Sequence, residues 1–191
     1  MAFSRAYRSQ SEYGPQGLRI CTPVTLLVCD RFVRGRGESV AELFTTEVVD
    51  DFMRSAHDMY ERRFPNARGP VSMSTLMGAQ RFVPNSREVA GTVHGSCEPL
   101  IVDDMTIAPL STLFEECMRS DRSTDCALLL TMCGHTTGFL FEHPERRAYH
   151  FDPLPASLKD VTSSVHGVDY SLDAYRVDAE YNGTFITSVG V

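Results

Sequence analysis

The sequence predicts an α+β fold in which helices come first along the chain and strands come later. From residue 21 to residue 64, apolar residues recur at spacings of three and four, which is typical of helices that bury one face. From residue 126 onward, short apolar runs alternate with turn sequences, which is typical of antiparallel strands. Helices and strands that are segregated in this way indicate an α+β protein. We therefore expect an N-terminal helical part packed on an antiparallel sheet.

Length, composition and charge exclude several classes of protein. The 191 residues are 42% hydrophobic and 23% charged, as in ordinary globular proteins, and this length predicts a single domain over residues 1–191. A net charge of −7 with scattered arginines argues against nucleic acid and against an anionic membrane as partners. No apolar run approaches the ~18 residues that span a membrane, and the polar N-terminus lacks the apolar stretch of a secretory signal. We expect a cytoplasmic protein.

Three helices are expected. The first runs from Cys21 to Val33, with Pro23 in its first turn, where a missing N–H removes no helical hydrogen bond. The second extends from Val40 to Phe64, with an apolar stripe opposite a charged face. The third covers residues 106–121. The segment 65–99 is rich in Gly, Pro, Ser and Asn, so we expect it to form a long loop or short strands.

Four strands are expected in the second half of the chain. The run Cys126–Cys133 is apolar throughout, which is typical of a central strand buried on both faces. Residues 137–142 and 148–152 form the next two strands, joined by the turn 143–147, and Pro153 stops the second of them. Residues 183–189 form the last.

Cys21 lies where a polar, turn-rich segment leads into the first expected helix. At a helix N-terminus the dipole and the free N–H groups favour the thiolate form of cysteine, which is the nucleophile. A structural cysteine at a helix start is the commoner alternative. The six cysteines include no C-x-x-C pair, so we expect neither a metal site nor a cofactor.

His135 and Asp152 form a second candidate pair. His135 precedes one expected strand and Asp152 ends the strand that returns beside it. In such a hairpin, Asp152 can accept a hydrogen bond from one ring nitrogen while the other nitrogen faces a thiol, as in a catalytic triad. A lone histidine at a strand end can also serve as a cap or turn residue. Gln10, upstream of Cys21, is a candidate oxyanion donor, although most glutamines near a chain end are solvated.

Two sequence blocks resemble the deubiquitinase domain of the herpesvirus large tegument proteins. The first comprises Ser9-Gln10-Ser11, Tyr13-Gly14-Pro15 and Ile20-Cys21, and the second comprises residues 129–138 and Tyr149 to Pro153. The resemblance spans both ends of the chain but not residues 35–105. It implies a papain-like cysteine protease fold and hydrolysis of ubiquitin conjugates. It also implies Cys21 as nucleophile, Gln10 as oxyanion donor, and ubiquitin or polyubiquitin chains as partners.

The chain departs from this family at the last motif. The family has Asp-Pro-His, whereas this sequence has Asp152-Pro153-Leu154. Three interpretations remain open: His135 is the base, His150 is the base, or the protein is an inactive relative that only binds ubiquitin. We favour His135, because a ring at position 150 projects from a point about 6–7 Å along the strand from Asp152.

We therefore expect a deubiquitinase that cleaves (iso)peptide bonds after the C-terminal glycine of ubiquitin through a thioester on Cys21. A cysteine acyltransferase of the transglutaminase type shares the Cys–His–Asp order and remains an alternative. Segment 65–105 and the turn near Pro144 are candidates for the channel that admits the ubiquitin tail. Glu98, Asp103 and Asp104 are candidates for pairing with basic residues of that tail, although a solvated loop is the commoner role for such residues. In a virus or an intracellular pathogen, the site of action would be the host cytosol.

Overall fold

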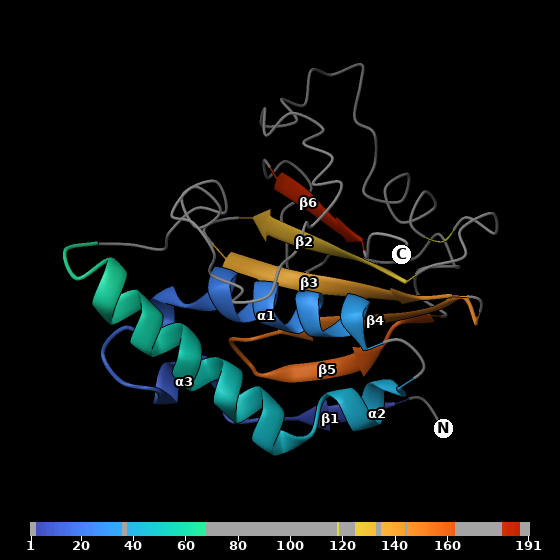
Figure 1. Cartoon of the computed structure of the whole chain (residues 1–191), viewed down its shortest axis with the longest axis horizontal. Coiled ribbons are helices and arrows are strands. Elements are labelled where there is room, and N and C mark those ends of the chain that lie inside the picture. The colour runs from blue at the N-terminus through green and yellow to red at the C-terminus, as the bar shows by residue number, and fades with distance from the viewer. Residues whose placement is uncertain are drawn as a thin grey trace, which may run out of the picture.

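An antiparallel sheet forms the centre of the computed structural model. The structure describes residues 3–35, 38–67, 118, 125–132, 135–143, 145–162 and 181–187. In these residues the sheet has six strands in the order β1-β5-β4-β3-β2-β6. The strands are β1 (Ser4–Ala6), β2 (Cys126–Met132), β3 (His135–Glu142), β4 (Arg147–Asp152), β5 (Ser157–Asp160) and β6 (Tyr181–Thr187). Figure 1 shows the strands fanned across the molecule, with β1 at one edge of the sheet and β6 at the other.

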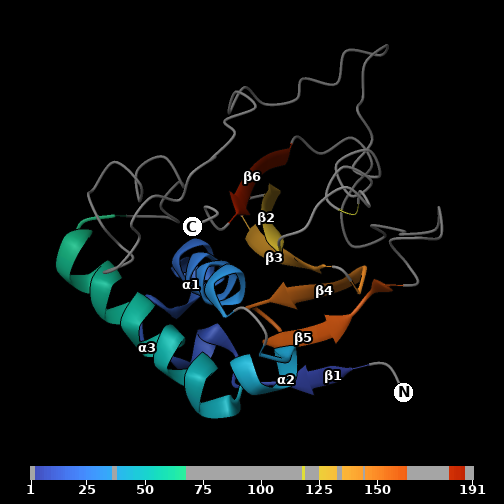
Figure 2. The same cartoon turned by 45° about the vertical axis from the view of Figure 1, so that its right-hand side comes forward.

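The helices with described bounds lie between residues 21 and 63. They are α1 (Cys21–Arg34), α2 (Val40–Leu43) and α3 (Thr46–Arg63), preceded by two short 3-10 turns, η1 (Gln10–Glu12) and η2 (Gly17–Arg19). Figure 2 shows α1 between the sheet and α3. Helices come before the central strands in the chain and pack on one antiparallel sheet, so the predicted α+β class is confirmed.

Helix α1 lies unusually close to β3 because of one glycine. A Cβ atom at Gly138 would lie 3.0 Å from Thr25 Cγ2 and 3.1 Å from Cys29 Sγ, closer than ordinary packing allows. The glycine therefore lets the helix that begins with Cys21 lie directly against the strand that begins with His135. This contact sets the distance between the two halves of the candidate site.

Strand β3 is buried on both faces. Gly138 faces α1, so Leu140 shares that face, while Phe139 and Phe141 point to the opposite face. All three of these large side chains are at most 1% exposed. Burial on two faces explains why β2 and β3 have continuous apolar runs instead of the alternation that is typical of a half-exposed strand.

The expected second helix, residues 40–64, is wrong as a single element, because the chain forms two helices there. Thr45 starts a new helix: its hydroxyl accepts a hydrogen bond from Val48 N at 3.4 Å. Phe44 leaves helical geometry, and its carbonyl accepts bonds from Arg5 Nη1 at 2.6 Å and from the Tyr7 hydroxyl at 2.9 Å. Arg5 of β1 and Tyr7, just after β1, thus provide hydrogen-bond donors for the free carbonyl at the end of α2.

The other expected boundaries differ less. α1 ends one residue later than expected, β3 begins at His135 instead of residue 137, and β6 begins at Tyr181 instead of residue 183. Strands β1 and β5 were not expected. Apart from Met118, the expected helix 106–121 lies outside the described residues, and so does the expected loop from residue 68 to residue 99. None of the described helices is long and apolar enough to cross a membrane.

Candidate active site

Cys21 is the first residue of α1. The preceding residue, Ile20, has non-helical backbone angles and provides no side-chain cap, so the first N–H groups of the helix remain available. The thiol is only 1% exposed. It therefore lies at the positive end of a 14-residue helix, in the setting that lowers the pKa of a cysteine.

His135 and Asp152 meet across the β3–β4 pair. The register places Gly138 opposite Phe151, so His135 is a diagonal neighbour of Asp152 on the same face. His135 Nε2 lies 2.8 Å from Asp152 Oδ1. The second ring nitrogen, Nδ1, remains available for another partner. Asp152 Oδ1 also accepts a hydrogen bond from Leu154 N at 3.0 Å, which holds the carboxylate in place from the turn that follows.

Cys21 and His135 act on each other electrostatically, each shifting the pKa of the other, so the structure brings Cys21 near the His135–Asp152 pair. Burial alone raises the pKa of the Cys21 thiol. The His135 ring, the backbone N–H of Thr136 and the Thr22 hydroxyl outweigh that effect, and the thiol pKa falls below its usual range.

The pKa of His135 is raised, whereas that of Cys21 is lowered. Burial disfavours the imidazolium, but the hydrogen bonds and negative charges of Asp152 and Cys21 raise the pKa of His135 to about 9. The pKa of Asp152 is lowered despite its burial, because His135 and Leu154 N–H bind the carboxylate. A low-pKa thiol beside a high-pKa imidazole favours a thiolate–imidazolium pair at neutral pH.

Gln10 is held beside this cluster. Its backbone N–H donates to the carbonyl of Pro153 at 3.2 Å, directly after Asp152 in the chain. Its side chain is 1% exposed, and its Oε1 has no hydrogen-bond partner among the residues that the structure describes. An amide exchanges oxygen and nitrogen by a half-turn, so it can present a donor or an acceptor. A buried amide with an unused polar end is suited to binding a polar group of a ligand.

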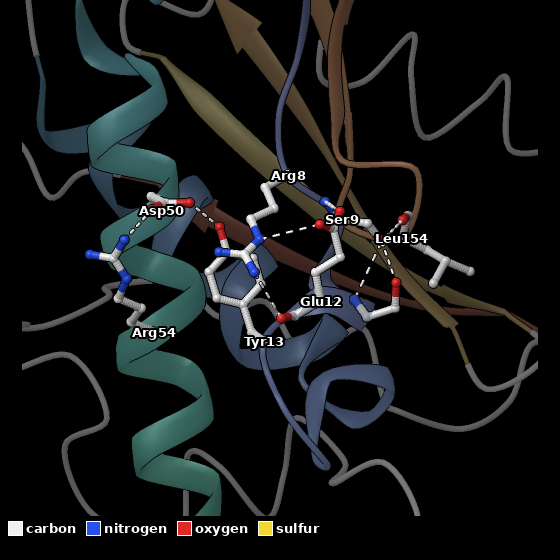
Figure 3. Close-up of polar contacts among 8 residues, drawn as sticks. Arg8, Ser9, Glu12, Tyr13, Asp50, Arg54 and Leu154 are labelled. Carbon is white, nitrogen blue, oxygen red and sulfur yellow. Dashed lines mark hydrogen bonds and ion pairs between the residues drawn. The ribbon is translucent and has the colours of Figure 1, made fainter.

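The segment that carries Gln10 is braced on the β4–β5 side by Ser9. The Ser9 hydroxyl donates to the carbonyl of Leu154 at 2.5 Å, and it also caps η1, with Glu12 completing the capping box (Figure 3). Ser9 and Gln10 therefore bind Leu154 and Pro153, which immediately follow Asp152. The turn at Pro153 and Leu154 thus supports both the Asp152 carboxylate and Gln10, the candidate oxyanion donor.

Helix α3 braces the same segment from the other side. The Tyr13 hydroxyl donates to Asp50, and Arg54 binds the same carboxylate (Figure 3). The Arg8 guanidinium lies 4.9 Å from the centre of the Tyr13 ring and 3.3 Å from the Glu12 carboxylate. These contacts tie η1 to α3, so Gln10 sits on a loop that is fixed at both edges.

His150 occupies a different environment. Its ring stacks on Phe139, with centroids 4.5 Å apart and planes at 19°. Its Nε2 is buried and has no hydrogen-bond partner in the described part of the chain. Burial lowers the pKa of His150 to about 4, so the ring is neutral at pH 7. The His150 imidazole packs against Phe139 as an aromatic ring, and its low pKa is poorly suited to proton transfer near neutral pH.

The sequence analysis did not single out the threonines around the sulfur. Thr22 follows Cys21 and Thr136 follows His135, and their hydroxyl oxygens lie 2.8 Å apart. Their position next to the two candidate residues was the only available signal. Over the described ranges, no group of three or more His, Cys, Asp or Glu side chains is placed to hold a metal ion. The expected channel residues 68–105 and Pro144 lie outside those ranges.

No family model matches this chain, and no curated protein matches it. Among solved structures, it is similar to the ubiquitin-specific protease encoded by murine cytomegalovirus tegument protein M48, which was solved in complex with a ubiquitin-based suicide substrate. The TM-score is 0.59 at 13% sequence identity, and the match covers 99% of this chain and 88% of that chain. At this identity the likeness shows a shared fold.

Proposed function

We propose that this chain is a papain-like cysteine deubiquitinase and that residues 1–191 form its single catalytic domain. The observation that carries the proposal is the 2.8 Å pairing of His135 Nε2 with Asp152 Oδ1, together with Cys21 at the start of α1, whose thiol pKa His135 lowers. This is the constellation of a nucleophile, a base and the group that orients the base. It is combined with the fold of a protease that was solved with a ubiquitin-based substrate.

The first step is attack by the thiolate. The Cys21 sulfur forms a bond to the carbonyl carbon of the C-terminal glycine of ubiquitin, and the carbonyl oxygen becomes an oxyanion. The N–H of Cys21, at the first position of α1, and the Gln10 side chain supply hydrogen bonds to this oxygen. The Gln10 Oε1 is buried without a partner in the described residues, so a half-turn of the amide would place the donor Nε2 there at no loss of a hydrogen bond.

The second step releases the amine. The His135 imidazolium gives its proton to the lysine nitrogen as the C–N bond breaks, which leaves a thioester on Cys21. Water then attacks the thioester while His135 takes a proton from it, and the C–S bond breaks to release ubiquitin with a free carboxylate. Asp152 stabilises the charged ring in both steps and holds Nδ1 toward the sulfur.

His135 is favoured over His150 as the base on two grounds. His135 is bound to Asp152 and lowers the pKa of Cys21, whereas the His150 ring is stacked on Phe139. Leu154, at the position of the family's histidine, donates its N–H to the Asp152 carboxylate and contributes no titratable group. The chain thus replaces the motif histidine with one on the neighbouring strand, in the ordinary papain-like order.

Ubiquitin or polyubiquitin is the proposed partner, and neither nucleic acid nor a membrane is part of the proposal. The proposed location is the cytosol, that of the host for a viral or intracellular pathogen protein. The likeness to the M48 protease supports ubiquitin, and the acidic net charge of −7 suits a substrate with basic residues in its tail.

Hydrolysis of a ubiquitin–peptide isopeptide conjugate tests the proposal. We expect turnover by the wild type, its loss in Cys21→Ala, and its retention in Cys29→Ala, because Cys29 is buried on the same helix with its thiol pKa raised by burial. Ubiquitin binding without turnover would instead indicate an inactive relative. Incorporation of an added amine in excess of hydrolysis would indicate a transglutaminase-like transferase.

A further inference from the structure

Three threonine hydroxyls form a continuous line behind the candidate nucleophile. Thr22 lies on α1, Thr136 on β3 and Thr131 on β2. Thr136 Oγ1 lies 2.8 Å from Thr22 Oγ1 and 2.8 Å from Thr131 Oγ1. Thr22 and Thr136 are at most 3% exposed, and Thr131 is half-buried. Three separate elements thus contribute hydroxyls to one buried hydrogen-bonded chain.

The sheet register explains why these hydroxyls meet. Thr131 and Thr136 are directly opposite each other in the β2–β3 pair, so their side chains share one face. That face is the one toward α1, since Gly138, two residues along β3, contacts the helix. Thr22, in the first turn of α1, therefore comes down onto Thr136. Thr22 directly follows Cys21 in the first turn of α1, and its hydroxyl is one of the groups that lower the pKa of the Cys21 thiol, so the line of hydroxyls leads to the nucleophile.

The direction of the hydrogen bonds follows from the number of protons. Each hydroxyl has one proton to donate, and a thiolate sulfur can only accept. With Cys21 as thiolate, Thr22 donates to the sulfur, Thr136 donates to Thr22, and Thr131 donates to Thr136, so every proton points toward the negative charge. Aligned donors polarise one another and strengthen the last bond. With a neutral thiol, the same line ends on a much weaker acceptor.

We propose that Thr131, Thr136 and Thr22 form a donor chain that holds Cys21 in the thiolate form, with Thr136 and Thr131 acting as positioning residues through Thr22. The inference deepens the proposed function, because it rests on Cys21 as the nucleophile. The backbone of Thr136 also lowers the pKa of this thiol. Substitution of the outer threonines thus changes the nucleophile without any contact to it.

Other groups also act on the Cys21 charge and must stay constant in a test. His135 faces the sulfur from β3, with Asp152 of β4 behind it. Tyr60 of α3 is near enough for the Cys21 charge to raise its pKa, and Arg19 of η2 acts on Tyr60 in the opposite sense. None of these side chains is altered when a threonine is replaced by valine, which has the same shape and lacks the hydroxyl.

Titration of the Cys21 thiolate tests the proposal. Thiolate absorbance in the ultraviolet is recorded against pH, and the curve of the corresponding Cys21→Ala protein is subtracted, so that the other cysteines cancel. We expect the apparent pKa of Cys21 to rise by about one unit or more in Thr22→Val, because a hydrogen bond to a charged group is lost. Thr136→Val shifts it in the same direction, and Thr22→Ser restores the wild-type value.

Thr25→Val is the matched control. Thr25 is buried on the same helix, and its hydroxyl donates to the carbonyl of Thr136 at 3.2 Å instead of joining the hydroxyl line. We expect no shift in its thiolate curve. Thermal unfolding shows whether each variant is folded. If either Thr22→Val or Thr136→Val is unfolded, the thiolate titration of the other variant tests the proposal. An unchanged Cys21 curve in the folded variant, or an equal shift in Thr25→Val, overturns the proposal. The titration uses no ubiquitin, so a failure of the proposed function is seen separately, as a normal thiolate without turnover.

Discussion

The Nε2 atom of His135 lies 2.8 Å from Oδ1 of Asp152, across two antiparallel strands and 17 residues apart in the chain. The pKa of the same ring is also raised by Cys21, at the start of the helix that packs on the sheet. A single imidazole therefore links a strand end, a strand start and a helix N-terminus. The proposed activity depends on His135 joining these three elements.

Asp152→Asn tests what the carboxylate does for the ring. The amide keeps the shape but removes the charge that, despite burial, raises the pKa of His135 to about 9. The imidazolium form exists below the pKa and is lost as pH rises through it, so the fall of kcat/KM on the alkaline side moves to lower pH. We expect kcat/KM near neutrality to fall by roughly a hundredfold or more. A pH profile with an unchanged alkaline limb would contradict this role.

Separate substitution of His150 and His135 distinguishes the roles of the two histidines. His150→Phe keeps an aromatic plate against Phe139 and removes a buried nitrogen that lacks a partner in the described chain. We expect hydrolysis within a few-fold of wild type and a thermal unfolding temperature that is equal or higher. His135→Gln is expected to abolish measurable hydrolysis. The opposite pattern, activity in His135→Gln and none in His150→Phe, would transfer the base to His150.

Ser9→Ala tests the brace on the segment of Gln10. The variant loses the bond from the Ser9 hydroxyl to the Leu154 carbonyl and the cap of η1, at a cost of about 0.5–2 kcal/mol in unfolding free energy. Because Gln10 serves the oxyanion and not the bound substrate, we expect kcat to fall more than KM changes. Ser9→Thr keeps the hydroxyl and is the matched control. Equal loss in both variants would show that the hydroxyl bond is not what matters.

Gly138→Ala tests the close approach of α1 to β3. The added methyl meets Thr25 and Cys29 at 3.0 and 3.1 Å, so helix and strand must separate. We expect a loss of about 1–3 kcal/mol in chemical denaturation. Cys29→Ala in the same background makes room for the methyl and is expected to recover part of that loss. No loss in Gly138→Ala would mean that the helix adjusts freely.

Much of this fold is predictable from local patterns. The start of α1 follows from the change at Cys21 from turn residues to helical spacing, and β2 to β4 follow from apolar runs separated by turns. The pairing of His135 with Asp152 also follows, because a short hairpin places a strand start beside a neighbouring strand end. Each of these inferences needs only residues that are close in the chain.

Features that depend on distant residues were missed. Strand β1 has three residues and exists through its pairing with β5, so neither has an apolar run of its own. The break between α2 and α3 is completed by Arg5 and Tyr7, which no local pattern connects to Phe44. The threonine line joins three elements, and threonine in a strand is ordinarily read as a β-former.

The most direct test of the central claim is the site at which a ubiquitin carrying an electrophilic C-terminus becomes attached to the chain. Peptide mass spectrometry of the adduct is predicted to place the modification on Cys21, and the adduct is predicted to form in Cys29→Ala but not in Cys21→Ala. Attachment at another cysteine, or no adduct with a folded protein that binds ubiquitin, would contradict the account.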